Sequence, residues 1–116
     1  MADSLQRFKA ELFKALAHPT RIRILELLRE GEKSVGVLQD ALFVDGSVVS
    51  QQLSVLRMKN LVDTRRQGTT IYYGLRDSQV NELLDIARHI FEAHVIQLQA
   101  MADSDETQPS ATVARR

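Results

Sequence analysis

The sequence contains no cysteine among its 116 residues. Disulfide bonds, thiolate metal sites and thiol-based redox sensing are therefore excluded. No stretch approaches the roughly 18 consecutive apolar residues that a membrane-spanning helix needs, and the N-terminal segment lacks the apolar centre of a signal peptide. We therefore expect a soluble, cytoplasmic protein with no membrane partner.

The sequence also lacks the motifs of common enzyme classes. It has no glycine-rich phosphate-binding loop, and no serine has an adjacent histidine and acid that could activate it. Because no nucleophile and base can be named, we predict that the chain is not an enzyme.

The chain as a whole has no excess of either sign of charge, but two of its segments do. The 15 basic and 15 acidic residues give a formal net charge of zero, which argues against an indiscriminate polycation. Residues 47–76 nevertheless hold five basic residues and one acidic residue, a net charge of +4. Residues 77–116 hold seven acidic residues and three basic ones, a net charge of −4. This asymmetry favours a protein with one basic side.

Length and apolar content favour a single ordered domain. A chain of 116 residues is too short for two full cores, and its apolar fraction of 44% is sufficient for one. We place this domain at residues 1–102. Residues 103–116 contain almost no bulky apolar side chain, so we expect a disordered tail there.

Hydrophobic periodicity predicts a mainly α fold with a small β-hairpin. Apolar residues recur at intervals of three and four in five segments, as in amphipathic helices. The predicted caps or first residues of these helices are Ser4, Pro19, Ser34, Asp45 or Ser47, and Asp77 or Ser78. Residues 61–75 instead form two β-prone runs around a polar tip. The predicted order, α-α-α-α-β-β-α, is that of a winged helix-turn-helix with extra helices at both ends.

The fourth predicted helix has the character of a DNA-recognition helix. It buries Val49, Leu53 and Leu56, and no acidic residue occurs from Ser47 to Val62. Hydroxyl and amide side chains on its outward side suit the edges of bases in a major groove, and either of its glutamines can pair with adenine. The predicted DNA contacts are Ser47, Val48, Ser50, Gln51, Gln52, Ser54 and Arg57. A plain solvated face is the alternative, but such a face would mix both signs of charge.

The predicted hairpin tip is basic and rich in hydrogen-bond donors. Such a tip can contact phosphates and reach into a minor groove. The predicted contacts are Arg65, Arg66, Gln67, Gly68, Thr69 and Thr70. Neighbouring strand residues point to opposite faces, so we expect only one of the two arginines to contact DNA strongly. Gly68 also has a structural role, because a tight turn requires glycine.

Four segments, residues 17–25, 50–56, 61–62 and 66–73, resemble the ArsR/SmtB family of bacterial repressors in order and spacing. The resemblance implies a homodimer whose first and last helices pack around the two-fold axis. It also implies a partly palindromic double-stranded DNA operator and release by an unidentified effector. The residues assigned to dimerisation are Leu5, Phe8, Leu12, Leu84, Phe91, Val95 and Leu98. Phe43 departs from the family, which commonly has a small residue in this turn; it would buttress the recognition helix or change its tilt.

The two metal sites best known in this family do not match the chain. The stretch from Ser34 has no cysteine, and on the last helix only Asp77 of four ligand positions is retained. Asp85, His89 and Glu92, spaced on one helical face, are a different candidate set for nickel or zinc. A solvated strip of ordinary ion pairs is the alternative. For the whole protein, the alternative to a repressor is a winged-helix module that binds proteins and not DNA.

Overall fold

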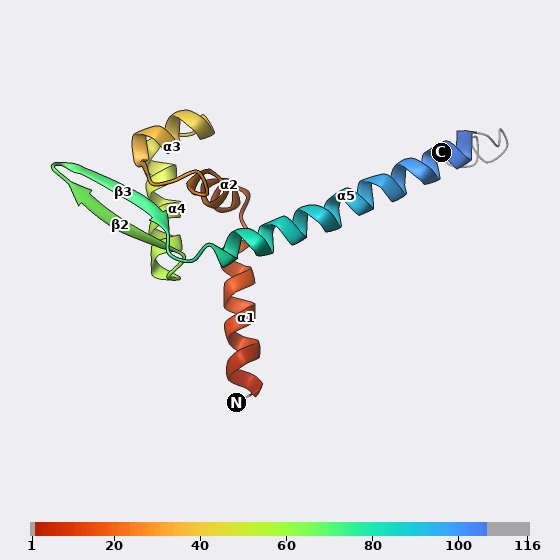
Figure 1. Ribbon diagram of the computed structural model, residues 1–116, viewed down its shortest axis with the longest axis horizontal. Coiled ribbons are helices and arrows are strands. Elements are labelled where there is room, and N and C mark those ends of the chain that lie inside the picture. The colour runs from red at the N-terminus through yellow and green to blue at the C-terminus, as the bar shows by residue number, and fades with distance from the viewer. Residues whose placement is uncertain (1, 107–116) are drawn as a thin grey trace. The chain divides into compact units, whose positions relative to one another are not determined.

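The computed structural model describes residues 2–106. The chain divides into two compact units, residues 1–81 and residues 82–116. The elements are α1 (Ala2–Leu16), α2 (Pro19–Leu28), β1 (Lys33–Ser34), α3 (Val35–Leu42), α4 (Gly46–Met58), β2 (Val62–Gln67), β3 (Thr70–Leu75) and α5 (Gln79–Glu106) (Figure 1). The predicted, mainly helical order is confirmed with one addition, the short strand β1, which is too short to show an alternating pattern in the sequence.

Local hydrogen bonds explain where the inner helices begin. The Nδ1 atom of His18 accepts a hydrogen bond of 3.2 Å from the backbone amide of Thr20, and Pro19 opens α2. The hydroxyl of Ser34 accepts a bond of 3.4 Å from the amide of Val37 at the start of α3. Each cap satisfies an amide that the first turn of a helix leaves without a partner. Helices α2 and α3 therefore begin at positions that the sequence itself specifies. By contrast, α1 begins at Ala2, before the predicted cap Ser4, and Asp45 precedes α4 without a side-chain cap bond.

The first unit has one apolar core built from three helices and a strand. The most buried side chains come from α2, α3, α4 and β2, each no more than 1% exposed: Ile24, Leu25, Leu38, Val49, Leu53, Leu56 and Val62. Burying a side chain of this size contributes about 1.5–3 kcal/mol. Because α4 supplies three of these residues from one side, its opposite side is held toward solvent.

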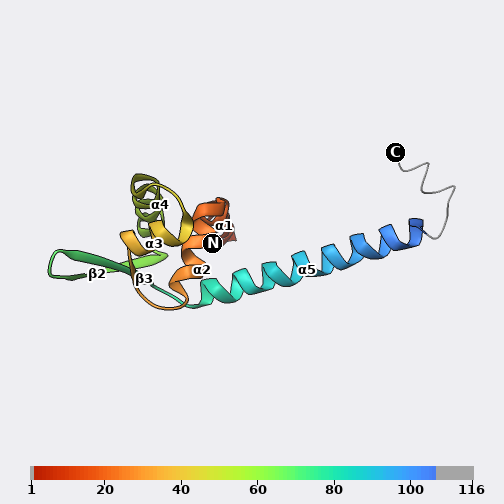
Figure 2. The ribbon, with the colours of Figure 1, turned by 90° about the horizontal axis from the view of Figure 1, so that it is seen from above.

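The three strands form an antiparallel sheet in the order β1-β3-β2. Gln67 pairs with Thr70, so Gly68 and Thr69 make a two-residue turn. Gly68 has φ +63° at the first central position, which type II′ turns give to glycine. The closed end of the β2–β3 hairpin, residues 65–70, is called the wing below. The hairpin projects beyond the helices of the first unit in both views (Figures 1 and 2).

The last helix extends past residue 102, the expected end of the ordered domain, and continues to Glu106. Residues 103–106 are thus helical, and the rest of the predicted tail, residues 107–116, lies outside the described residues. Within residues 2–106, no helix combines the length and the apolar character needed to cross a membrane.

Candidate nucleic-acid interface

The outward side of α4 consists of polar, basic and small apolar side chains. Six of the seven residues predicted to contact DNA are exposed: Ser47, Val48, Ser50, Gln51, Ser54 and Arg57. The seventh, Gln52, is half-buried at one edge of this side. The helix contains no acidic residue, so no carboxylate on it would repel a phosphate.

Two of these polar side chains have hydrogen bonds within the protein. The hydroxyl of Ser54 donates a bond of 3.0 Å to the backbone carbonyl of Ser50. The amide oxygen of Gln52 accepts a bond of 3.0 Å from the guanidinium of Arg21 in α2. Spacing along the chain could not predict this second contact, because the two residues lie 31 positions apart. Gln51 is exposed and keeps both donors and acceptor for another molecule, since no described residue bonds its amide.

The two arginines of the wing have different surroundings. Arg65 forms an ion pair of 2.9 Å with Glu32, and its guanidinium carbon lies 4.9 Å from the centre of the Tyr72 ring. The hydrogen bond to Glu32 raises the pKa of Arg65. Arg66 is exposed, and none of the carboxylates in the described part of the chain pairs with it. Arg66 is therefore the wing arginine that is available to a phosphate.

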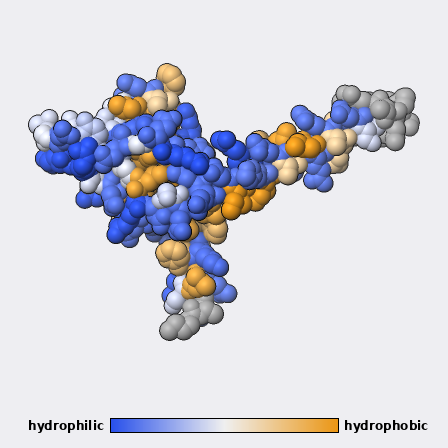
Figure 3. All heavy atoms as spheres, in the orientation of Figure 1, coloured by the Kyte–Doolittle hydropathy of each residue, from blue (hydrophilic) through white to orange (hydrophobic). Residues whose placement is uncertain are grey.

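The remaining tip residues are polar and accessible. Gln67, Gly68 and Thr69 are exposed and Thr70 is half-buried. The amide oxygen of Gln67 accepts a bond of 3.0 Å from Arg65. The free end of the wing accordingly shows hydrophilic and neutral colours in Figure 3. Because α4 packs against β2, the outward side of α4 and the wing belong to one compact unit.

Other basic residues beside α4 are held by partners on the chain. The ammonium of Lys59 lies 2.9 Å from a carboxylate oxygen of Glu11 in α1, and this hydrogen bond and charge lower the pKa of Glu11. Arg76 lies 3.2 Å from the amide oxygen of Asn60 and 3.7 Å from Asp63. These pairs fix α1 and the start of β2 against the neighbouring elements, so their first role is structural.

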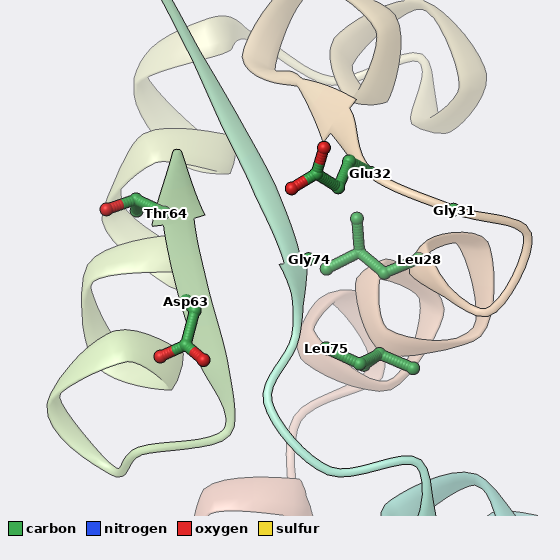
Figure 4. A pocket seen from close by; sticks show the side chains of 7 residues that line it. All are labelled: Leu28, Gly31, Glu32, Asp63, Thr64, Gly74 and Leu75. Carbon is green, nitrogen blue, oxygen red and sulfur yellow. The ribbon is translucent and has the colours of Figure 1, made fainter. Parts of the chain in front are cut away.

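A pocket of about 390 Å³ lies where the end of α2 meets the open end of the β2–β3 hairpin. Its lining residues are Leu28, Gly31, Glu32, Asp63, Thr64, Gly74 and Leu75. Figure 4 shows Asp63 and Thr64 on one side of β3 and Leu28 and Glu32 on the other. Both carboxylates in this lining already have a cationic partner, Arg65 for Glu32 and Arg76 for Asp63. We assign no effector to this pocket.

The residues predicted for dimerisation keep much of their apolar surface in the single chain. On α1, Leu5 is 55% and Phe8 65% exposed; on α5, Phe91 is 65% and Leu98 50% exposed. Leu12, Leu84 and Val95 are half-buried. Apolar side chains are visible along both helices (Figure 3). Each of the two helices thus carries an apolar face of its own.

The candidate metal ligands are not brought together. In the part of the chain that the structure describes, no three His, Asp or Glu side chains are grouped so that they could hold a metal ion. Asp85, His89 and Glu92 therefore do not form the predicted nickel or zinc site within one chain. Residues seven positions apart are separated by about 10.5 Å along a helix, whereas metal–ligand bonds are about 2 Å long.

Phe43 does not buttress the recognition helix. It ends α3 in the left-handed conformation, with φ 56°, and its side chain is 91% exposed. A side chain with so little contact cannot support a neighbouring helix by packing.

Known proteins share both the sequence pattern and the fold. Residues 18–64 match the model of a family of bacterial regulatory proteins, the arsR family. The HTH-type transcriptional regulator Rv0081 of Mycobacterium tuberculosis is 46% identical over 90 residues, which are 77% of this chain and 79% of that relative. The chain belongs to the ArsR family. The resemblance found in the sequence is thereby confirmed.

Further relatives of this ArsR-family chain agree with its architecture. The biofilm growth-associated repressor of Agrobacterium fabrum is 42% identical, over 71% of this chain and 70% of its own length. The crystal structure of Rv0081 superposes with a TM-score of 0.71 at 44% identity, over 83% of this chain and 96% of that one. A homodimeric winged helix-turn-helix DNA-binding domain from Mycobacterium bovis has a TM-score of 0.71 at 32% identity, over 79% and 85% of the two chains. The predicted winged helix-turn-helix fold is confirmed.

Proposed function

We propose that the chain is a homodimeric, sequence-specific repressor that binds a partly palindromic operator in double-stranded DNA and is released by an effector. One observation carries this proposal. The outward side of α4 has no acidic residue, and it lies in the same unit as a wing whose Arg66 has no carboxylate partner among the described residues. A surface of this kind suits a polyanion whose bases are accessible in a groove.

The two parts of the surface have separate tasks. In the proposed complex α4 enters the major groove, where Gln51 donates to and accepts from a base edge and Val48 contacts a thymine methyl group. Ser47 and Ser50 lie near the start of α4, where unpaired backbone amides favour phosphate. Arg57 and Arg66 contact the phosphate backbone. Base contacts would supply specificity, and phosphate contacts would supply affinity and register.

The dimer is proposed to form through the apolar faces of α1 and α5. Leu5, Phe8, Phe91 and Leu98 are each at least 50% exposed in the single chain, so a second copy would remove considerable apolar surface from water. The relative from Mycobacterium bovis is homodimeric, which supports this arrangement. The proposed activity is binding in the cytoplasm, with no catalytic step.

The proposal is tested by electrophoretic retardation of the promoter region of the protein's own gene. The full chain should retard this DNA in preference to an unrelated duplex of equal length, and the retardation should weaken as salt rises from about 50 to 200 mM. Undetectable or salt-insensitive binding would contradict the proposal and favour the alternative, a winged-helix module that binds a protein.

A further inference from the structure

Arg21 connects the end of α1 to the recognition helix. Its Nε atom donates a hydrogen bond of 2.6 Å to the carbonyl of Ala15, and one terminal nitrogen lies 3.3 Å from the carbonyl of Lys14. The last turn of a helix leaves such carbonyls without an amide partner four residues on, and the carbonyl of Lys14 also accepts a bond of 3.2 Å from the amide of Ala17. The other terminal nitrogen donates the bond of 3.0 Å to the side-chain oxygen of Gln52. Arg21 is half-buried, and its guanidinium thus bonds to α1 on one side and to α4 on the other.

This contact determines how the amide group of Gln52 is oriented. A guanidinium has five N–H donors and no acceptor, so the atom of Gln52 that faces Arg21 must be the oxygen. The planar amide then directs its two N–H donors away from Arg21. Gln51 differs, because it is exposed and no described residue bonds its amide.

The two glutamines therefore offer different groups to a base. A glutamine pairs with adenine by accepting from N6 and donating to N7 at the same time. Gln51 has both groups available. The oxygen of Gln52 faces Arg21, so its N–H donors are the groups directed away from α2. Donors match the guanine edge, where O6 and N7 are both acceptors.

We propose that Arg21 is a positioning residue that makes Gln52 a hydrogen-bond donor to the operator, so that Gln52 selects guanine over adenine at one base position in each half-site. This inference rests on the proposed function. For Gln52 it replaces the expectation from the sequence that either glutamine can pair with adenine. A second bridge between the same two helices, the ion pair of Lys59 with Glu11, helps to keep α1 in place beside α4.

The inference is tested by selecting duplexes from a random DNA library with the full chain and with Gln52→Met. The natural protein should enrich guanine at one position per half-site, and Gln52→Met should reduce that preference about tenfold, because a good side-chain pair with a base discriminates by that order. Gln52→Glu keeps the acceptor for Arg21 but has no donor, so it should lose the same preference. Gln51→Met is the matched control and should change a different, adenine position.

Arg21→Met supplies the complementary experiment. Without the guanidinium, the amide of Gln52 can rotate and pair with adenine, so the preference at the Gln52 position should move from guanine toward adenine. Circular dichroism and a melting curve establish that this variant is folded. If it does not fold, the two Gln52 variants decide the question by themselves.

Three results would overturn the inference: adenine at the Gln52-dependent position of the natural protein, no position altered by Gln52→Met, or a guanine preference that a folded Arg21→Met variant retains. A natural protein that enriches no sequence at all would instead contradict the proposed function. The two failures are therefore distinguishable.

Discussion

Replacing Arg66 with alanine should reduce the salt dependence of operator binding. Arg66 is exposed at the wing, and among the described residues no carboxylate competes with DNA for its charge. Each neutralised phosphate contributes about 0.9 to the slope of log K against log salt concentration. A dimer that places two wings on DNA should therefore lose about 1.8 from this slope. Over a rise from 50 to 200 mM salt, the affinity advantage of the natural protein over the variant should shrink about twelvefold.

Arg65 provides the matched control, because it is the same residue type one position away. Its guanidinium is held by Glu32 at 2.9 Å and lies over the Tyr72 ring. Arg65→Ala should change the slope less than Arg66→Ala does and should lower the melting temperature more, since Glu32 loses its partner. Fluorescence anisotropy of a labelled operator at three salt concentrations measures both slopes. An unchanged slope in Arg66→Ala, or an equal loss in both variants, would refute this assignment of the wing.

Three further predictions concern the dimer, the turn and the pH dependence of stability. Phe91→Glu should convert the dimer to a monomer in sedimentation experiments. Ile96 is equally exposed, at 65%, but lies about 140° away around α5, so Ile96→Glu should leave the protein dimeric. A dimeric Phe91→Glu variant would contradict the proposed face. Gly68→Ala should lower the free energy of unfolding, measured in urea, by about 1 kcal/mol, because the φ of Gly68 is +63°. Gly36 lies in α3 with open space around it, so Gly36→Ala should raise the free energy of unfolding by about 0.5–1 kcal/mol. Equal effects of the two substitutions would refute the explanation from backbone conformation. Lys59 lowers the pKa of Glu11 in the folded protein. The ion pair therefore stabilises the fold at a pH above the ordinary pKa of a glutamate, and this contribution is lost as the pH falls through the lowered pKa of Glu11. The difference in melting temperature between the natural protein and Glu11→Gln should accordingly shrink with acidification, and a constant difference would show that the ion pair contributes nothing.

Local patterns along the chain were sufficient to predict most of the fold. The spacing of Val49, Leu53 and Leu56 predicted the buried side of the recognition helix, and all three side chains are 0% exposed. Asn60, two residues past the end of that helix, has φ 61°, a left-handed conformation that asparagine adopts more readily than most residues. These features depend on neighbours within a few residues, which is why periodicity and capping rules detect them.

Features that depend on distant residues could not be predicted in this way. Strand β1 exists because Lys33 and Ser34 pair with Tyr73 and Tyr72, and two residues are too few for an alternating pattern. The exposed polar set on α4 could be derived from helical geometry. The bond between Arg21 and Gln52 and the ion pair between Glu32 and Arg65 could not, because each joins residues more than 30 positions apart. These contacts separate the side chains that are engaged within the protein from those available to DNA.

Hydroxyl-radical footprinting of the full chain on a selected operator shows whether two copies of α4 and the wing face one side of a duplex. We expect two symmetry-related protected regions whose centres are about 34–36 Å apart, or a multiple of that distance, on one face of the DNA. Protection of a single region without symmetry, or no protection at concentrations where the dimer is present, would rule out this mode of binding.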